Sequence, residues 1–316
     1  MARVYNVEAL SSKDVEAEIL FAIEQGLENE PSWINDIAMP SVTDSKLELM
    51  FPGAPSPAHE LKLPRTVEDI KMYGLELGPK EWDIGFRVKE QDLRRDRLGF
   101  LQRRADVEIG QRIAQLWPKV ISARLNNGLT EDIWDGKKLF SNTHTLGTST
   151  VDNLYAGTTA ADPVTAAEMR NYIWEVIEGM RTLTDDAGEP LQAAREFMVM
   201  VPPQLLRVAS EAIEFPIVSV GSAGAEFNTL GGNKHFTIDL VENPWLTSSL
   251  RFFVFAKNGQ AFVRLAEYEP IPEKLAEGSD HQVKNLEHLY FVRASRSVGA
   301  WRYHDVAVFD INLGGG

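Results

Sequence analysis

Apolar side chains recur every three or four positions through residues 92–126, which is the spacing that places them on one face of an α-helix. The residues that follow this spacing are Leu101, Ala105, Ile109, Ile113, Leu116 and Val120. A single helix over this range would be about 52 Å long at 1.5 Å per residue. Pro118 lies inside it and predicts a bend near Ala114, because the proline ring clashes with the preceding turn. We therefore expect these residues to form the buried face of one long, bent helix.

The pattern before this helix is different. Residues 11–28 still repeat at helical spacing, but residues 45–91 alternate between polar and apolar and are interrupted by prolines. Trp82, Ile84 and Phe86 are separated by single residues, so they share one face of a predicted strand. A two-stranded hairpin of this kind is only marginally stable in water by itself. We therefore expect residues 45–91 to form an extended segment that lies against another surface.

The pattern after residue 162 predicts a compact region in which helices and strands alternate. Residues 165–185 repeat at helical spacing, and residues 197–201 form a continuous apolar run typical of a buried strand. Pro202 is expected to begin the next helix, because proline is favoured in the first helical turn. The chain ends in further strand-like segments between residues 288 and 311. Together these patterns predict an α+β fold.

The composition narrows the functional classes. The chain has 316 residues, no cysteine and a formal net charge of −14. The absence of cysteine excludes disulfides, thiolate metal sites and a cysteine nucleophile, and it fits a protein made in a reducing cytoplasm. A protein that grips nucleic acid usually carries a basic face, so any contact with DNA is expected to be nonspecific. No apolar run approaches the roughly 20 residues that span a bilayer, and no secretory signal pattern is visible.

Residues 132–147 hold the residue types of a catalytic triad, namely Asp135, Ser141, Thr143 and His144. Asp-Gly at 135–136 is a signature of a tight hairpin turn, and the hydroxyl residues and histidine fall on the return strand. An aspartate at such a turn points away from His144 in most hairpin geometries. We therefore interpret this segment as a structural turn without catalytic function.

Other candidate motifs fail on spacing. His59 and Glu60 begin like a zinc-protease helix, but Leu63 occupies the position of the second histidine. His281 and His288 have no second ligand one helical turn away. The glycine-rich residues 221–232 match neither phosphate-binding loop pattern. The residues thus predict no metal site, no cofactor and no enzymatic activity.

Four stretches resemble the Mu-like prophage major head subunit (T protein) family of tailed-phage capsid proteins. They are DRLGFLQRRADVEIGQRIAQLWPKVI (96–121), DGKKLFSNTHTLG (135–147), VENPWLTSSLRFFVFA (241–256) and LYFVRASRSVGAWRY (289–303). The resemblance spans nearly the whole chain. It implies the Hong Kong 97-type capsid fold, with an N-terminal arm, an extended β-hairpin loop, a long spine helix with a peripheral β-sheet, and an α/β axial domain.

The resemblance also implies a division of the chain. The N-terminal arm would span 1–44, the extended loop 45–91, the peripheral domain with the spine helix 92–163, the axial domain 164–284, and the return strands of the peripheral domain 285–316. Because the family places the extended loop across a neighbouring subunit, the face formed by Trp82, Ile84 and Phe86 is expected to contact that neighbour. The spine helix core would be Leu101, Ile109, Ile113, Leu116 and Val120.

The implied function is that of a major capsid protein, a structural protein and not an enzyme. Its copies would self-assemble into the hexamers and pentamers of an icosahedral phage head around double-stranded DNA. The location would be the virion, after assembly in the host cytoplasm. The implied partners are other copies, a separate scaffolding protein, a maturation protease, the portal, nonspecifically packaged DNA and a decoration protein where one exists, with no membrane. A negatively charged wall would let the entering DNA slide.

Two alternatives remain open at this point. An encapsulin-like cellular nanocompartment has the same fold and packages enzymes instead of DNA. A soluble hydrolase would need a set of polar catalytic residues, and the sequence shows no motif for one. Microscopy of the purified protein separates a shell from a soluble enzyme directly.

Overall fold

The computed structural model describes residues 21, 28–43, 47–52, 72–91, 108–146, 149–157, 164–184, 194–215, 217–219, 225–230, 233, 235–257, 259–275 and 278–311. Most of the predicted helix 11–28 and the spine residue Leu101 lie outside these residues. Within them the fold is a mixture of helices and strands, as the pattern predicts. None of the described helices is long and apolar enough to cross a membrane.

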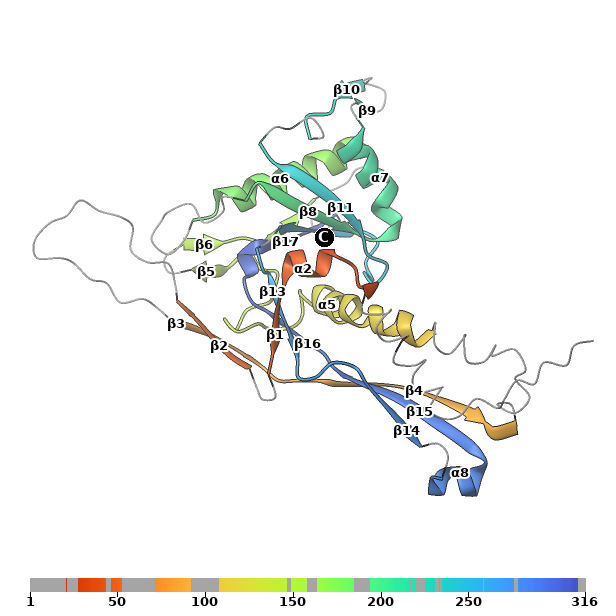
Figure 1. Cartoon of the computed structure of the whole chain (residues 1–316). Helices are drawn as coiled ribbons and strands as arrows, with labels where there is room; N and C mark the ends of the chain where they lie inside the picture. Colours follow the sequence, from red (N-terminus) through yellow and green to blue (C-terminus); the bar gives the residue numbers. More distant parts are fainter. Residues whose placement is uncertain are drawn as a thin grey trace, which may run out of the picture.

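A five-stranded sheet forms the centre of the upper part of the molecule (Figure 1). Its strands, in spatial order, are β11 (Thr237–Glu242), β8 (Glu196–Val201), β12 (Arg251–Ala256), β17 (Val306–Asp310) and β7 (Leu154–Ala156). β11 runs parallel to β8, whereas β12 runs antiparallel to both β8 and β17. Every residue of β17 is buried. The last strand of the chain therefore lies inside this sheet.

This position of β17 differs from the predicted division of the chain, which assigns residues 285–316 to the return strands of the peripheral domain. β17 pairs with β12 from Arg251 opposite Asp310 to Phe255 opposite Val306. A strand that is apolar on both faces needs a covered position within a sheet, and only a sheet with packed layers on both sides provides one. Residues 306–310 are thus part of the same sheet as β8, β11 and β12.

Two helices cover one face of this sheet. They are α6 (Ala166–Thr182) and α7 (Pro203–Glu214), and their apolar residues pack on Phe197, Phe252 and Phe309. α6 begins with a capping box, in which Thr165 and Glu168 each accept a hydrogen bond from the other's backbone N–H. α7 begins at Pro203, one residue later than predicted, because Pro202 is its extended N-cap.

The opposite face is covered by α5 (Leu116–Asn126) and α2 (Trp33–Ile37), as Figure 1 shows. Ile121, which is fully buried, lies in one cluster with Met198, Phe253 and Val306 of the sheet. The sheet is therefore a buried layer between two layers of helices.

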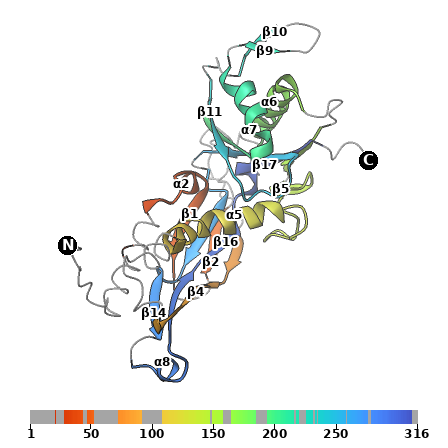
Figure 2. The ribbon, with the colours of Figure 1, turned by 90° about the vertical axis from the view of Figure 1, so that its right-hand side faces the viewer.

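A long antiparallel sheet extends from this body toward α8 (Asp280–Asn285) at the far end of the molecule (Figures 1 and 2). Its strand order is β14 (Ile271–Leu275), β15 (Glu287–Ser295) and β4 (Glu81–Lys89). β4 pairs with β15 along its whole length, from Glu81 opposite Ser295 to Lys89 opposite Glu287. The second half of the predicted extended loop is therefore a full strand of a sheet within its own subunit.

The remaining strands form smaller sheets. β1 (Ala38–Val42), β13 (Phe262–Ala266) and β16 (Ser297–Ala300) make a three-stranded sheet. The two-stranded pairs are β2 (Leu47–Pro52) with β3 (Met72–Leu77), β5 (His144–Leu146) with β6 (Ser149–Val151), and β9 (Ile217–Ser219) with β10 (Ala225–Phe227). A short 3-10 helix, η2 (Tyr303–Asp305), precedes β17.

The predicted long helix is interrupted. Residues 108–114 are helical, Gln115 is a turn, and α5 continues from Leu116. Pro118 has no N–H to donate to Ala114, so the helical hydrogen-bond ladder is interrupted at this turn. The break therefore lies next to Ala114, where the sequence predicts a bend.

The described apolar residues of this helix are buried in two places. Ile109 and Ile113 are 3% and 2% exposed and pack with Tyr290 and Val292 of β15. Leu116 and Val120 belong instead to the cluster beneath the five-stranded sheet. The helix thus joins the long sheet to the central sheet.

Replacing Ile113 with aspartate is expected to prevent folding. The substitution places a charge among Ile109, Tyr290 and Val292, and burial of an unpaired charge costs several kcal/mol, a large part of a typical stability of about 5–15 kcal/mol. Gln111→Asp, on the exposed side of the same helix, is the matched control. Circular dichroism during thermal unfolding measures both. Melting of Ile113→Asp at the wild-type temperature would show that this face is not part of the core.

Candidate functional site

His144 lies at the centre of the loop that resembles a catalytic triad in sequence. Its side chain is fully buried, and its Nδ1 lies 2.6 Å from Oδ2 of Asp135. The prediction that Asp135 points away from His144 is therefore wrong. Asp135 is positioned by accepting a hydrogen bond from the backbone N–H of Lys137, and His144 stacks on Tyr303 with ring centroids 4.2 Å apart. The turn and the return strand are joined by this buried pair.

The pair is nevertheless not a catalytic triad. Nε2 of His144 faces the backbone carbonyl of Leu139 at 3.1 Å, which is the position that a nucleophilic hydroxyl would occupy. The Ser141 hydroxyl instead contacts the Thr143 hydroxyl at 2.9 Å. Both ring nitrogens of His144 thus face oxygen atoms of the same loop, at Asp135 and at Leu139. These two contacts hold the turn against the return strand.

The charge on Asp135 depends on this contact. Burial raises the pKa of Asp135, but the hydrogen bonds from His144 and from the Lys137 backbone outweigh it, so the pKa lies below its ordinary value of 3.8. A carboxyl group whose pKa is lowered by folding stabilises the folded state above its unfolded pKa and loses that contribution as the pH falls. The loop is therefore expected to weaken in acid.

A second polar cluster lies where α5 meets the sheets. The Arg296 guanidinium is 2% exposed, lies 2.8 Å from Glu269 and stacks over Trp117, 5.0 Å from the ring centroid. Arg264 approaches the same indole at 5.6 Å and donates a hydrogen bond to Asn35. This cluster ties together segments that are far apart in the sequence.

Glu30 joins this cluster from the N-terminal side. Its carboxylate lies 4.0 Å from Arg264. Burial raises the pKa of Glu30, and the nearby Arg296 and Arg264 oppose that rise. No local spacing in the sequence links Arg296 to Glu30 or Trp117, so sequence patterns do not reveal this cluster. The cluster joins residues 30–35 to the body of the subunit.

The predicted contact face on β4 is already covered in part within the subunit. Ile84 and Phe86 pack on the cluster of Ile109 and Tyr290, and Phe86 stacks on Tyr290 at 5.1 Å. Trp82 donates its indole N–H to the Arg296 carbonyl at 2.8 Å. Pairing with β15 brings β4 beneath the helix, so the chain's own helix and strand cover this face in part. A contact of its remaining exposed part with a neighbouring subunit stays a prediction.

The β9–β10 hairpin and α8 lie at opposite ends of the molecule (Figures 1 and 2). Several of the exposed large apolar side chains belong to these two ends. One group lies around the β9–β10 hairpin: Phe215, Ile217 and Phe227, which is 84% exposed. The other lies on β14 and around α8: Ile271, Leu275, Val283 and Leu286. Exposed groups of large apolar residues mark surfaces that bind other molecules. Among the described residues, no group of three or more acidic or histidine side chains could hold a metal ion.

The sequence model of the phage capsid protein family matches residues 78–310, which is most of the chain. The chain belongs to the phage capsid protein family. This capsid protein is therefore a structural protein of the virion and not an enzyme. No curated protein matches its sequence. This family assignment confirms the predicted phage capsid protein, and it does not distinguish the Mu-like head subunits from other phage capsid proteins.

Solved structures share the fold of this capsid protein. The capsid of the cyanophage P-SCSP1u matches with a TM-score of 0.62 at 12% identity, over 98% of this chain and 93% of that chain. The mature capsid of bacteriophage PhiM1 matches with a TM-score of 0.61 at 13% identity, over 90% and 88% of the two chains. A virus-like particle from Pyrococcus furiosus matches with a TM-score of 0.53 at 8% identity, over 94% and 98%. The mixed α/β fold is thus that of Hong Kong 97-like capsid structures.

Substituting Asp135 with asparagine is expected to destabilise this capsid protein at neutral pH. Loss of a hydrogen bond to a charged group is worth about 1.5–3 kcal/mol. The pKa of Asp135 is below 3.8 in the folded state. The difference in unfolding free energy between wild type and Asp135→Asn should therefore be largest at neutral pH and should shrink as the pH falls below about 4. Denaturant unfolding at several pH values measures it. Asp132→Asn, at an exposed ion pair with Lys138, is the control. If the difference in unfolding free energy stayed the same in acid, the lowered pKa of Asp135 would be contradicted.

Proposed function

We propose that this chain is the major capsid protein of a tailed phage or prophage, which forms the hexamers and pentamers of an icosahedral shell around double-stranded DNA. The match of the phage capsid family over residues 78–310 carries this proposal. The shared fold with the P-SCSP1u and PhiM1 capsids supports it. Within the family, the four resembling stretches favour a relationship to the Mu-like prophage major head subunit.

The distribution of apolar surface supports association between copies. Apolar residues are exposed at both ends of the subunit, around the β9–β10 hairpin and around α8. Two different surfaces that meet on neighbouring copies make a head-to-tail contact, which closes into a ring when the rotation between copies allows it. Such contacts are suited to capsomers built from many identical chains.

The hairpin of β2 and β3 is the part of the extended loop that we propose reaches a neighbouring subunit. β3 contacts its own chain through Leu75 and Leu77, which lie near Gly299 of β16. Residues 53–71 join the two strands and lie outside the described residues. With β4 placed in the long sheet, we propose that the intersubunit clamp is confined to residues 47–77. We keep the arm, spine-helix and axial divisions as a proposal. Four strands pair across these divisions: β7 and β17 lie in the central sheet, β13 pairs with β1 and β16, and β14 pairs with β15.

The partners that we propose follow from shell assembly. A separate scaffolding protein, a maturation protease and a portal would act while the shell forms in the host cytoplasm, and a decoration protein would bind afterwards where one exists. The packaged DNA would be contacted without sequence specificity, because the chain has 46 acidic and 32 basic residues apart from histidine. Such a wall repels phosphates weakly and does not trap the entering genome.

A nanocompartment shell is the second candidate function. The Pyrococcus furiosus virus-like particle has the same fold at 8% identity, so the fold alone does not separate a phage head from another kind of shell. The phage capsid family match favours the phage head. The contents of the particle distinguish the two functions.

Purified protein expressed with its scaffolding and packaging partners is expected to form closed icosahedral particles that protect DNA from nuclease. Electron microscopy and nuclease digestion measure the two properties. Particles that contain a protein cargo and no protected DNA would support the nanocompartment instead. A protein that stays monomeric at high concentration, with or without its partners, would contradict shell formation altogether.

Replacing residues 53–71 with a short Gly-Ser linker is expected to leave a folded subunit that does not form shells. The substitution spares Trp82 and Ile84, which pack in the subunit's own clusters, so thermal stability should change little. A Gly-Ser segment of the original length is the control, since it separates the reach of the loop from its chemistry. Sedimentation and microscopy measure assembly. Normal particles from the short-linker variant would show that the loop is not an intersubunit clamp.

A further inference from the structure

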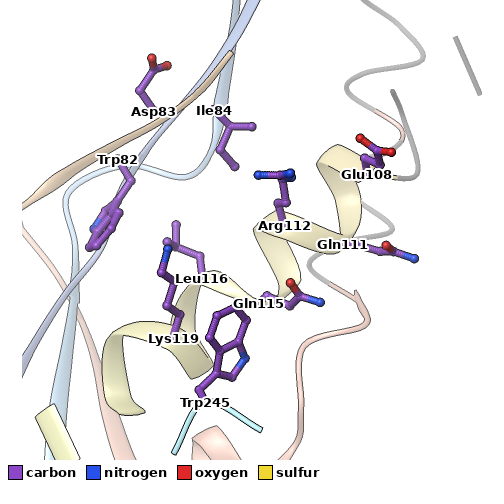
Figure 3. Close-up of a pocket in the computed structure, with 10 residues that line it drawn as sticks. All are labelled: Trp82, Asp83, Ile84, Glu108, Gln111, Arg112, Gln115, Leu116, Lys119 and Trp245. Carbon is purple, nitrogen blue, oxygen red and sulfur yellow. The ribbon is translucent and has the colours of Figure 1, made fainter. Parts of the chain in front are cut away.

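A recess lies beside β4, between the helix 108–126 and the loop that follows β11 (Figure 3). Its volume is about 500 Å³. The side chains that form its walls are Trp82, Ile84, Arg112, Leu116, Lys119 and Trp245. Three segments far apart in the sequence therefore build one concave surface. Its lining is mixed, because the side chains of Asp83, Glu108, Gln111 and Gln115 complete it.

The walls of the recess are fixed before anything binds. The Trp245 carbonyl accepts a hydrogen bond from the Asn126 side chain at 3.0 Å, and the Trp245 N–H donates to Asn243 at 3.0 Å. The Trp82 indole is held by its hydrogen bond to the Arg296 carbonyl. The Trp82 indole and the backbone of Trp245 thus keep their positions without a ligand, and a preformed site loses less entropy on binding.

The cationic groups point into this space. The Lys119 ammonium lies 5.9 Å from the ring centroid of Trp82 and 6.0 Å from that of Trp245. Figure 3 shows the Arg112 side chain directed toward the same space beneath Ile84, whereas Asp83 points away. Within the described part of the chain, neither Arg112 nor Lys119 forms an ion pair. Two cations between aromatic walls are suited to bind a carboxylate that carries an apolar neighbour.

We infer that this recess binds a carboxylate side chain and an adjoining apolar residue from an extended segment of a second copy of the chain. The inference rests on the proposed shell-forming function. Each copy carries a net charge of −14, so copies repel one another at long range and need local pairs of opposite charge to set their orientation. A recess of this volume admits a few side chains and is too small for a helix. Nucleic acid is disfavoured, because a chain with a net charge of −14 repels a phosphate backbone.

Carbodiimide cross-linking tests the identity of the occupant. The reagent joins an amine to a carboxylate only when the two are in contact, so Lys119 should be linked to an aspartate or glutamate. Shells are assembled from an equal mixture of isotopically heavy and light subunits, and the linked peptides are identified by mass spectrometry. We expect mixed heavy–light peptides that contain Lys119. Lys119→Arg keeps the charge and should lose these peptides while the shells still form.

Three outcomes would overturn the inference while leaving shell formation intact. They are shells in which Lys119 is linked only within its own chain, shells in which it is linked only to a scaffolding protein, and shells in which it is not linked at all. Absence of shells from the wild-type protein would instead count against the proposed function. The two failures are therefore distinguishable by microscopy of the same sample.

Charge reversal provides an independent measurement. Arg112→Glu with Lys119→Glu should raise the subunit concentration needed for assembly about tenfold or more, as expected when opposite charges become like charges at a contact. Arg195→Glu with Arg207→Glu changes the net charge equally at exposed positions and should leave this concentration within about twofold of wild type. Equal effects of the two double variants would show that only the overall charge matters, and would overturn the inference.

Discussion

The five-stranded sheet is covered on both faces, and this constraint positions most of the remaining chain. Strands β8, β12 and β17 are buried almost throughout, so no polar face is available to water. α6 and α7 must therefore lie on one side, and α5 with α2 on the other. Because α5 continues from the helix 108–114, the same packing also places the long sheet of β4, β14 and β15. A buried sheet thus determines the direction in which the subunit extends.

The extended shape leaves apolar side chains exposed at its ends. In a monomeric protein such residues would be a liability for aggregation, whereas in a capsid protein they are available for contacts between copies. The net charge of −14 opposes indiscriminate association. Apolar contacts attract copies of the chain to one another, and repulsion between their negative charges restricts association to surfaces that match. The recess with Arg112 and Lys119 fits this balance, because it offers positive charge beside apolar side chains on an otherwise acidic chain.

The segment 132–147 shows how residue types can suggest a function that geometry excludes. Asp135 and His144 do pair, although a generic hairpin geometry predicts that they point apart. Spacing along the chain does not report that the Lys137 N–H holds the Asp135 carboxylate inward. The absence of catalysis follows from a different contact, since Nε2 of His144 faces the Leu139 carbonyl. The predicted orientation of Asp135 was wrong, whereas the structural role of this loop stays a prediction.

The sequence by itself determined the local elements of this protein. Apolar periodicity predicted α6, β8 and the helix around Ile109 and Ile113, and Pro118 predicted the break near Ala114, because backbone geometry and proline chemistry act over a few residues. Family-specific stretches led to the capsid fold. Only the tertiary structure decided that Ile84 and Phe86 pack against Ile109 and Tyr290 of their own chain, that β17 enters the central sheet, and that Arg296 meets Glu269 and Trp117. Periodicity shows which face of an element is apolar, but the surface that covers this face comes from residues that can lie more than a hundred positions away.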